Sequence, residues 1–253
     1  MISTMQTTKK ALKMVASILF WIVVWHIAAT ITNKNLLIPI PTPFSTFNAL
    51  VVGLKESTFY LSAVYSVVRI AIGFLLALFF GTVLGILSSK IELLDTLFSP
   101  LLKVIRAIPV VSFIILVFLW MKRDSVPTFI AFLTVLPIIW TNVKSGINAT
   151  DKQLIEIAKV MGMKRGAILK NIVIPQAFPF ISSAISTGLG FAWKSGVAAE
   201  VICRTQNSLG NLLSSEKSIA NYDDVFAVTV IVVILSVIFE YSISSVLKRR
   251  MKK

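Results

Sequence analysis

Cysteine, histidine and acidic residues are scarce in this sequence of 253 residues. It has one cysteine, one histidine and 11 Asp or Glu residues, against 25 Lys or Arg residues. One cysteine excludes an intramolecular disulfide and a cysteine-based metal cluster. One histidine excludes a His-x-x-x-His pair. We therefore expect neither a metal site nor an enzyme that depends on one.

A complete nucleotide-binding P-loop is also missing. The stretch GLGFAWKS, residues 188–195, has the first glycine and the Lys-Ser pair of that motif at the right spacing, but Trp193 stands where the second glycine belongs. No soluble strand precedes the stretch. We therefore expect this chain to bind neither ATP nor another cofactor.

Apolar residues, in contrast, make up 56% of the sequence, and the mean hydropathy is +0.86. A soluble domain of this size is less apolar, so the chain is predicted to use lipid as its solvent. A bilayer core about 30 Å thick requires roughly 20 apolar residues per helix, and long apolar runs without strand alternation favour helices over a barrel. We predict an all-α polytopic membrane protein with one transmembrane domain over residues 1–253. Its six predicted spans are residues 14–32, 58–88, 99–121, 126–146, 176–203 and 224–247.

The net charge of +14 is distributed in a pattern that predicts the orientation of the chain. Lys and Arg residues concentrate at both termini and in alternate loops between the spans, as the positive-inside rule describes for cytosolic segments. Both termini and the loop 147–175 are therefore predicted to be cytosolic. A nucleic-acid-binding protein would instead gather its basic residues on one soluble face, so the lipid bilayer is an expected partner and nucleic acid is not.

This loop contains a polar, basic hairpin between two apolar segments. Thr150 followed by Gln153 suits a capping box, so a first helix is predicted to begin near Asp151. Gly162 is predicted to end that helix, because a residue without Cβ adopts positive φ at little cost. A second helix should follow. Pro175 is predicted to separate that second helix from the next span, because proline lacks an amide hydrogen.

The order of residues in this hairpin resembles the cytoplasmic EAA loop of permease subunits in bacterial ATP-binding-cassette importers. Glu-x-Ala is followed by Gly four residues after the Ala, and Ile-x-Ile-Pro closes the pattern. Two positions depart from the family pattern by apolar exchanges, Ile157 for Ala and Ile174 for Leu. The resemblance extends from about Ser62 to the C-terminus, and its outer segments are most similar to the nitrate, sulfonate and taurine branch.

In that family the hairpin is a coupling helix, which docks in a groove of a separate ATPase subunit. The resemblance also implies an extracytoplasmic substrate-binding protein and a second copy of the permease as partners, in the bacterial cell membrane. The chain would not itself be an enzyme, because the ATPase subunit binds and hydrolyses ATP. The residues to which the resemblance gives a docking role are Glu156, Ala158, Gly162, Met163, Lys164, Ile172 and Pro175.

The expected function is that of a membrane-spanning permease subunit, which forms the translocation pathway of an ATP-driven importer. The branch resemblance implies a small anionic substrate such as nitrate, a sulfonate or taurine. Two alternatives stay open. The same machinery could import a neutral vitamin precursor, or the chain could be an ATP-independent channel or secondary transporter, which would leave the hairpin without a purpose.

Four residues are candidates for the pathway or its gate. Pro109 invites a kink near the cytosolic mouth, close to Arg106, although a helix bent only for packing is the alternative. Ionisable side chains at membrane depth are costly, roughly 2.5 to 3.5 kcal/mol at a helix centre, so Lys194 and Glu200 are functional candidates. Lys194 could attract an anion or pair across helices, and Glu200 could line the pathway or hold a neighbouring helix. At six residues apart, the two should project on different sides of one helix.

Two further features concern packing between helices. Arg69 and Glu240 also lie at membrane depth and are expected to be partners of neighbouring polar groups. Gly81 and Gly85 form a G-x-x-x-G pair, which lets helices approach closely. We expect this pair to pack on another helix, either of this chain or of a second copy.

Overall fold

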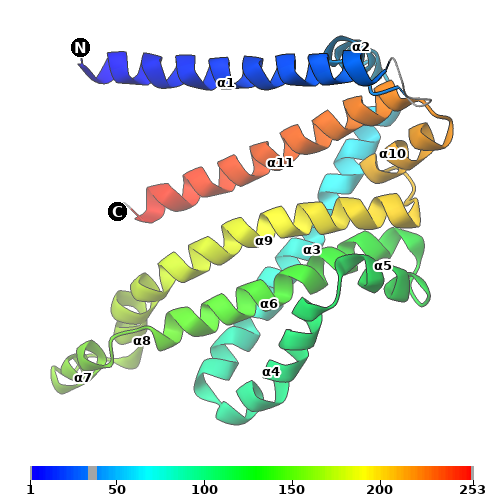
Figure 1. Cartoon of the computed structure of the whole chain (residues 1–253). Coiled ribbons are helices and arrows are strands. Elements are labelled where there is room, and N and C mark those ends of the chain that lie inside the picture. The colour runs from blue at the N-terminus through cyan, green and yellow to red at the C-terminus, as the bar shows by residue number, and fades with distance from the viewer. Residues whose placement is uncertain (1, 34–38, 252–253) are drawn as a thin grey trace.

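The computed structural model describes residues 2–33 and 39–251, and every regular element in these ranges is a helix (Figure 1). The predicted all-α fold class is therefore confirmed. Lys34, Lys252 and Lys253, which contribute to the predicted charge asymmetry, lie outside the described residues. In chain order the elements are α1 (Ile2–Thr32), α2 (Pro43–Gly53), α3 (Ser57–Lys90), α4 (Glu92–Ala107), α5 (Val110–Phe118), η1 (Arg123–Ser125), α6 (Val126–Asn148), α7 (Lys152–Val160), α8 (Arg165–Ile168), η2 (Leu169–Val173), α9 (Ile174–Cys203), α10 (Leu209–Ser218) and α11 (Tyr222–Met251).

Five stretches of the described chain are long and apolar enough to cross a membrane, and a sixth is obtained if α4 and α5 count as one bent span. Each stretch overlaps one of the spans expected from hydropathy. Length and composition thus support the polytopic arrangement. The five stretches are Leu12–Thr32, Ser57–Lys90, Arg123–Asn148, Arg165–Cys203 and Tyr222–Ser245.

The segment expected as the third span, residues 99–121, is not one kinked helix. It is divided between α4 and α5, whose axes differ in direction by 101°. Ile108 is extended, with φ −78° and ψ 130°, as is usual for a residue before proline. Pro109 is the N-cap of α5, where a missing amide hydrogen breaks no helical hydrogen bond. The proline therefore ends one helix and begins the next, rather than lying inside a helix as expected.

The centre of the fold is α6, which packs along both α3 and α9. Glycines on α3 allow the first of these contacts. A Cβ on Gly73 would lie 2.3 Å from the carbonyl oxygen of Thr128, and a Cβ on Gly81 would lie 2.8 Å from the Cβ of Ile139. Gly85 faces α6 in the same way. The predicted G-x-x-x-G pair therefore packs on a helix of its own chain.

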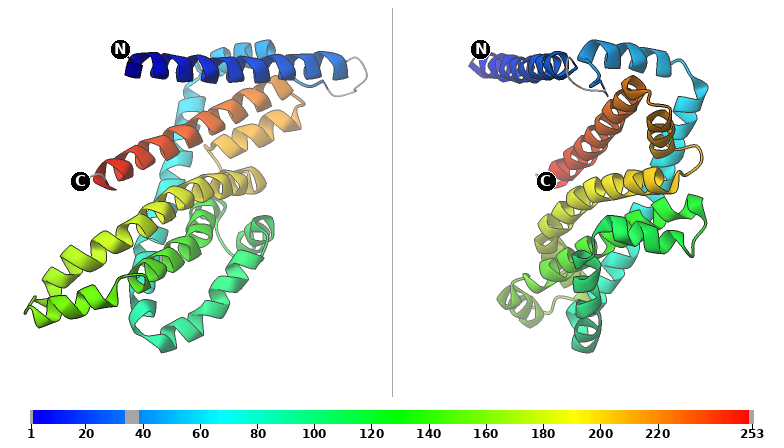
Figure 2. Two further views of the ribbon diagram at one scale, coloured as in Figure 1. Left: turned by 60° about the vertical axis from the view of Figure 1, so that its left-hand side comes forward. Right: turned by 45° about the vertical axis from the view of Figure 1, so that its right-hand side comes forward.

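The long helices α1 and α11 lie at the periphery of this core and expose most of their apolar side chains. The indole of Trp25 on α1 donates to the Pro41 carbonyl (3.0 Å) and stacks on Phe226 of α11. The indole of Trp193 on α9 donates to the Val232 carbonyl of α11 (3.0 Å). One end of the molecule, called here the hairpin end, contains the N-terminal end of α1, the C-terminal end of α11 and the helix α7 (Figures 1 and 2). The helix α10 lies toward the opposite end, called here the α10 end.

Candidate functional site

The hairpin expected from the sequence is present, with α7 and α8 at the hairpin end (Figure 1). The residue that caps α7 is Asp151, whose carboxylate accepts hydrogen bonds from the amides of Gln153 (2.8 Å) and Leu154 (3.4 Å). The predicted capping box at Thr150 is wrong. The Thr150 hydroxyl donates instead to the carbonyl of Gly146, so it serves the end of α6.

The C-terminus of α7 is a turn that favours glycine. The amide of Gly162 donates to the Lys159 carbonyl (3.0 Å), and the amide of Met163 donates to the Ala158 carbonyl (2.9 Å). These two bonds form a Schellman motif. Gly162 has φ +74°, and no atom lies within 4 Å of the position that a Cβ would take. Backbone conformation, rather than lack of space, therefore accounts for glycine at this position.

The second helix of the hairpin is not separated from the next membrane span. It continues from α8 through the π-helical turn η2 into α9, and the whole stretch Arg165–Cys203 qualifies as one apolar helix. Pro175 lies in the first turn of α9. The prediction that this proline breaks the helix is therefore wrong. The wider π turn directly before it leaves room for the proline ring.

The outward face of α7 is apolar and exposed. Ile157, Val160 and Met161 are 55%, 89% and 76% exposed, and their spacing places them on one side of the helix end. The sequence analysis did not predict this face, although apolar residues spaced three to four positions apart would have indicated it. Of the residues with a predicted docking role, Glu156, Gly162, Lys164 and Pro175 are exposed, Met163 and Ile172 are half-buried, and Ala158 is buried.

Arg106, a candidate for the gate, joins α4 to α6. Its Nη2 donates to the Pro137 carbonyl (2.8 Å) and to the Thr141 hydroxyl. Beside this contact the two helices enclose a cavity of about 140 Å³, called here the α4–α6 cavity. Pro109 is not part of its lining. The polar residues that line it are Asp95, Ser99, Lys103, Arg106, Thr141 and Lys144.

Lys194 and Glu200 lie in different surroundings on α9. Lys194 is exposed at the surface of the chain, whereas Glu200 is completely buried. The Oε2 of Glu200 accepts hydrogen bonds from the Ser66 hydroxyl of α3 (2.7 Å) and from the Gly210 amide of α10 (3.3 Å). Ser66 Oγ in turn accepts a hydrogen bond from the amide of Leu209 (2.9 Å). This one carboxyl group therefore ties together α3, α9 and the N-terminus of α10.

The other two ionisable residues at membrane depth differ in their contacts. Arg69 donates to the Asn207 carbonyl (3.1 Å) and lies 3.8 Å from the carboxylate of Asp124, so it is a partner of polar groups, as expected. Glu240 on α11 lies against Gly190 of α9, where a Cβ would be 2.7 Å from the Glu240 Oε1. No hydrogen bond or ion pair of Glu240 is found within the described ranges.

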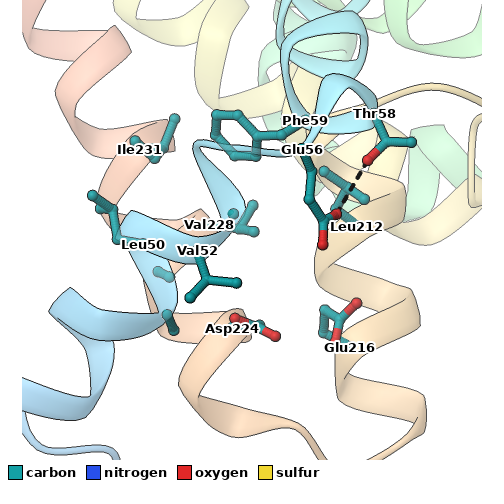
Figure 3. A pocket seen from close by; sticks show the side chains of 13 residues that line it. Leu50, Val52, Glu56, Thr58, Phe59, Leu212, Glu216, Asp224, Val228 and Ile231 are labelled. Carbon is teal, nitrogen blue, oxygen red and sulfur yellow. Dashed lines mark hydrogen bonds between the residues drawn. The ribbon is translucent and has the colours of Figure 1, made fainter.

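A second cavity, of about 100 Å³, lies at the α10 end between α2, α10 and α11 (Figure 3). Its walls are mostly apolar, with Glu56, Glu216 and Asp224 around it. The Thr58 hydroxyl donates to Glu56 (3.3 Å), and the Asn221 side-chain amide donates to Glu216 (2.9 Å). Within residues 2–33 and 39–251, no group of three or more His, Cys, Asp or Glu residues is arranged so that it could hold a metal ion.

Comparison with curated proteins identifies relatives that are named as permeases. The chain is 28% identical over 225 residues to a protein of Methanocaldococcus jannaschii named as an ABC transporter permease, covering 87% of this chain and 83% of that protein. It is 28% identical to a protein of Bacillus subtilis named as an aliphatic sulfonates transport permease (74% and 68% covered). It is 23% identical to the taurine transport system permease of Escherichia coli (89% and 84% covered).

The fold is shared with solved transporters. A chain of the bacterial alginate ABC transporter, crystallised with its alginate-bound periplasmic protein, superposes with a TM-score of 0.67 over 98% of this chain and 97% of that chain, at 12% identity. Residues 77–253 also match the family described as binding-protein-dependent transport system inner membrane component. That match covers most of the sequence, so the chain belongs to the family of inner membrane components of binding-protein-dependent transport systems.

Proposed function

We propose that this chain is the permease subunit of an ATP-driven importer for small organic anions of the sulfonate type. A separate ATPase docks at the hairpin end, and an extracytoplasmic binding protein delivers the substrate at the α10 end. Two copies of the chain enclose the pathway, so that two identical hairpins receive two identical ATPase subunits. The chain itself is not an enzyme, because ATP is bound and hydrolysed by the partner.

The observation that carries this proposal is the exposed apolar face of α7. It lies on a hairpin that also carries Lys159, Lys164 and Arg165, and such basic residues mark segments in the cytosol rather than in lipid. An apolar surface with a polar rim, exposed to water, is typical of a protein interaction site. A short amphipathic helix of this kind fits a groove of its partner. An ATP-independent channel would have no use for this surface.

A sulfonate-type substrate is supported by the relatives and by the charges of this chain. The relatives from B. subtilis and E. coli are named for aliphatic sulfonates and taurine, which share a sulfonate group. Lys103 and Arg106 at the α4–α6 cavity attract anions and repel cations. Lys194 stays a candidate pathway residue, since its side chain is exposed rather than buried in an ion pair. The neutral-precursor alternative would make no use of these positive charges.

Replacing Val160 by aspartate should weaken capture of the ATPase at least about tenfold. The exchange removes roughly 1.5 to 3 kcal/mol of apolar burial and adds a charge to the docked interface. The measurement is recovery of the co-expressed ATPase on the tagged, full-length permease. Ile219→Asp is the matched control, because Ile219 is also an exposed apolar residue (70%) but lies at the α10 end. Equal capture by both variants would contradict docking at α7.

The substrate proposal is tested by uptake into vesicles that contain the permease, its ATPase and its binding protein. Labelled taurine and ethanesulfonate should be taken up in an ATP-dependent manner, and an uncharged pyrimidine should not. Uptake of the pyrimidine alone would favour the neutral-precursor alternative. Uptake without ATP would favour a channel or secondary transporter.

Orientation is tested by labelling of single cysteines at the two ends. Cysteines at Gly166 on the hairpin and at Ile219 near α10 should react from opposite sides of the membrane, with Gly166→Cys reactive only from the cytosol. Background from Cys203 should be low, because this residue is 2% exposed. Reaction of both cysteines from the outside of intact cells would contradict a cytosolic hairpin.

A further inference from the structure

The α4–α6 cavity is rich in hydrogen-bond donors. Ammonium and guanidinium groups of Lys103, Lys144 and Arg106 line it, together with the hydroxyl groups of Ser99 and Thr141. Its volume of about 140 Å³ is that of a few water molecules, at about 30 Å³ each. The cavity therefore has room for a small oxyanion group, but not for a large solute.

Only part of the positive charge at this cavity is neutralised within the chain. Lys144 forms an ion pair with Asp95, the one carboxylate in the lining. Arg106 is fixed by the Pro137 carbonyl and the Thr141 hydroxyl, both uncharged, so its charge has no counterion there. Lys103 has no hydrogen bond or ion pair among the residues that the structure describes. The cavity thus keeps two unneutralised cations, Lys103 and Arg106.

These observations separate a binding site from a purely structural contact. Two polar contacts already join α4 to α6, the bonds of Arg106 and the Lys144–Asp95 ion pair. Packing gives no reason for a second cation beside Arg106, since like charges repel each other. Asp95 and Lys144 neutralise each other, so the lining keeps an excess of positive charge. Positive charge in a cleft raises the local concentration of small anions, by about 10- to 1,000-fold where the lining has one sign of charge.

We propose that the α4–α6 cavity binds the sulfonate head of the transported anion near the cytosolic end of the pathway. A sulfonate has only hydrogen-bond acceptors, and the unneutralised groups that line the cavity are donors. Lys103 provides the mobile charge, and Arg106 provides a fixed guanidinium. This inference rests on the proposed function, because it assumes that the transported solute is an anion.

The test uses a cysteine at Ser99, which is half-buried in the cavity wall. The full-length chain with Cys203→Ser, in nanodiscs of zwitterionic lipid, is treated with two thiol reagents of similar size, a 2-sulfonatoethyl and a 2-(trimethylammonium)ethyl methanethiosulfonate. The labelling rate with the sulfonate reagent is divided by the rate with the ammonium reagent. This ratio is then divided by the same ratio measured for a small free thiol. We expect about a tenfold preference for the sulfonate reagent at Ser99→Cys, and protection by ethanesulfonate. Lys103→Gln removes one of the two unneutralised charges, so it should lower the ratio and weaken the protection.

Gly166→Cys is the matched control, because it lies beside Lys164 and Arg165 and no atom lies within 4 Å of the position that its Cβ would take. The same preference and protection at Gly166 would overturn the proposal, because they would show only a basic surface. A lipid phosphate is the other source of oxyanion chemistry. If anionic lipid slows labelling at Ser99→Cys while ethanesulfonate has no effect, the cavity is a lipid site and the proposal fails.

A failure of the cavity proposal can be distinguished from a failure of the proposed function. If the cavity does not bind the anion, the reagent ratio at Ser99→Cys stays near one while vesicles still take up ethanesulfonate. If the proposed function is wrong, uptake is absent although the ratio and the protection can be measured on the isolated chain. The cavity proposal therefore stands or falls on the labelling result.

Discussion

Replacing Gly162 by valine is expected to abolish most transport while leaving the protein in the membrane. The Schellman turn at Gly162 requires φ +74°, and a β-branched residue in the left-handed region is strained by roughly 1 to 3 kcal/mol. The hairpin can relieve this strain by opening the turn, which moves the apolar face of α7 relative to α8. A cost of this size lowers the population of the docking geometry by about 5- to 160-fold. ATP-dependent uptake and ATPase capture should both fall accordingly.

The controls for this prediction lie within the same hairpin. Gly166→Val is matched in space, because nothing lies within 4 Å of a Cβ at either glycine, but positive φ is recorded only for Gly162. Gly162→Asn should retain more activity than Gly162→Val, since asparagine tolerates the left-handed region better. If Gly166→Val were as damaging as Gly162→Val, bulk rather than backbone strain would explain the loss.

Replacing Glu200 by alanine is expected to have the largest effect on stability. Alanine cannot accept the hydrogen bonds from the Ser66 hydroxyl and the Gly210 amide, and each unsatisfied buried polar group costs about 1 to 3 kcal/mol. The N-terminus of α10 also loses a carboxyl group at the positive end of its dipole. We expect the apparent melting temperature to fall by roughly 5 to 15 °C. Hydrogen exchange should increase first in α10.

Two substitutions separate the role of Glu200 from a general effect of removing a carboxyl group. Glu200→Gln keeps one carbonyl oxygen that can accept both hydrogen bonds, so it should destabilise less than Glu200→Ala. Glu240→Ala removes an exposed carboxyl from α11 and should change the melting temperature little. A stable Glu200→Ala protein with normal exchange in α10 but no uptake would show that Glu200 acts on the pathway instead of holding helices together.

Hydropathy was sufficient for the fold class, because membrane helices must satisfy their own hydrogen bonds and therefore leave long apolar runs in the sequence. The hairpin was also predictable, since Gly162 and the basic residues around it are local signals. The two hairpin predictions that were wrong concern residues whose conformation depends on contacts with neighbouring segments. Asp151 displaces Thr150 as the cap because the Thr150 hydroxyl is engaged by α6. Pro175 continues a helix because the π turn before it accommodates the ring.

The contacts of the pathway candidates could not be read from the sequence. Glu200 was known to be costly at membrane depth, but its partner Ser66 is 134 residues away along the chain. Arg106 and Thr141 are likewise brought together only by the crossing of α4 and α6. Such pairs are set by helix packing, which in α3 follows from glycines that meet α6 closely. A single sequence shows which residues need partners, but not which residues those are.

The uninterrupted path from α8 through η2 into α9 has a mechanical consequence. It contains 39 residues, or about 58 Å at 1.5 Å per residue, and it joins the hairpin directly to the residue that anchors α10. A lever of this length converts a small rotation into a large displacement. A tilt of about 5° about the hairpin moves the far end of α9 by about 5 Å, close to the rise of one helical turn. If Pro175 had broken the helix, a tilt of the hairpin would not be transmitted along α9 to its far end.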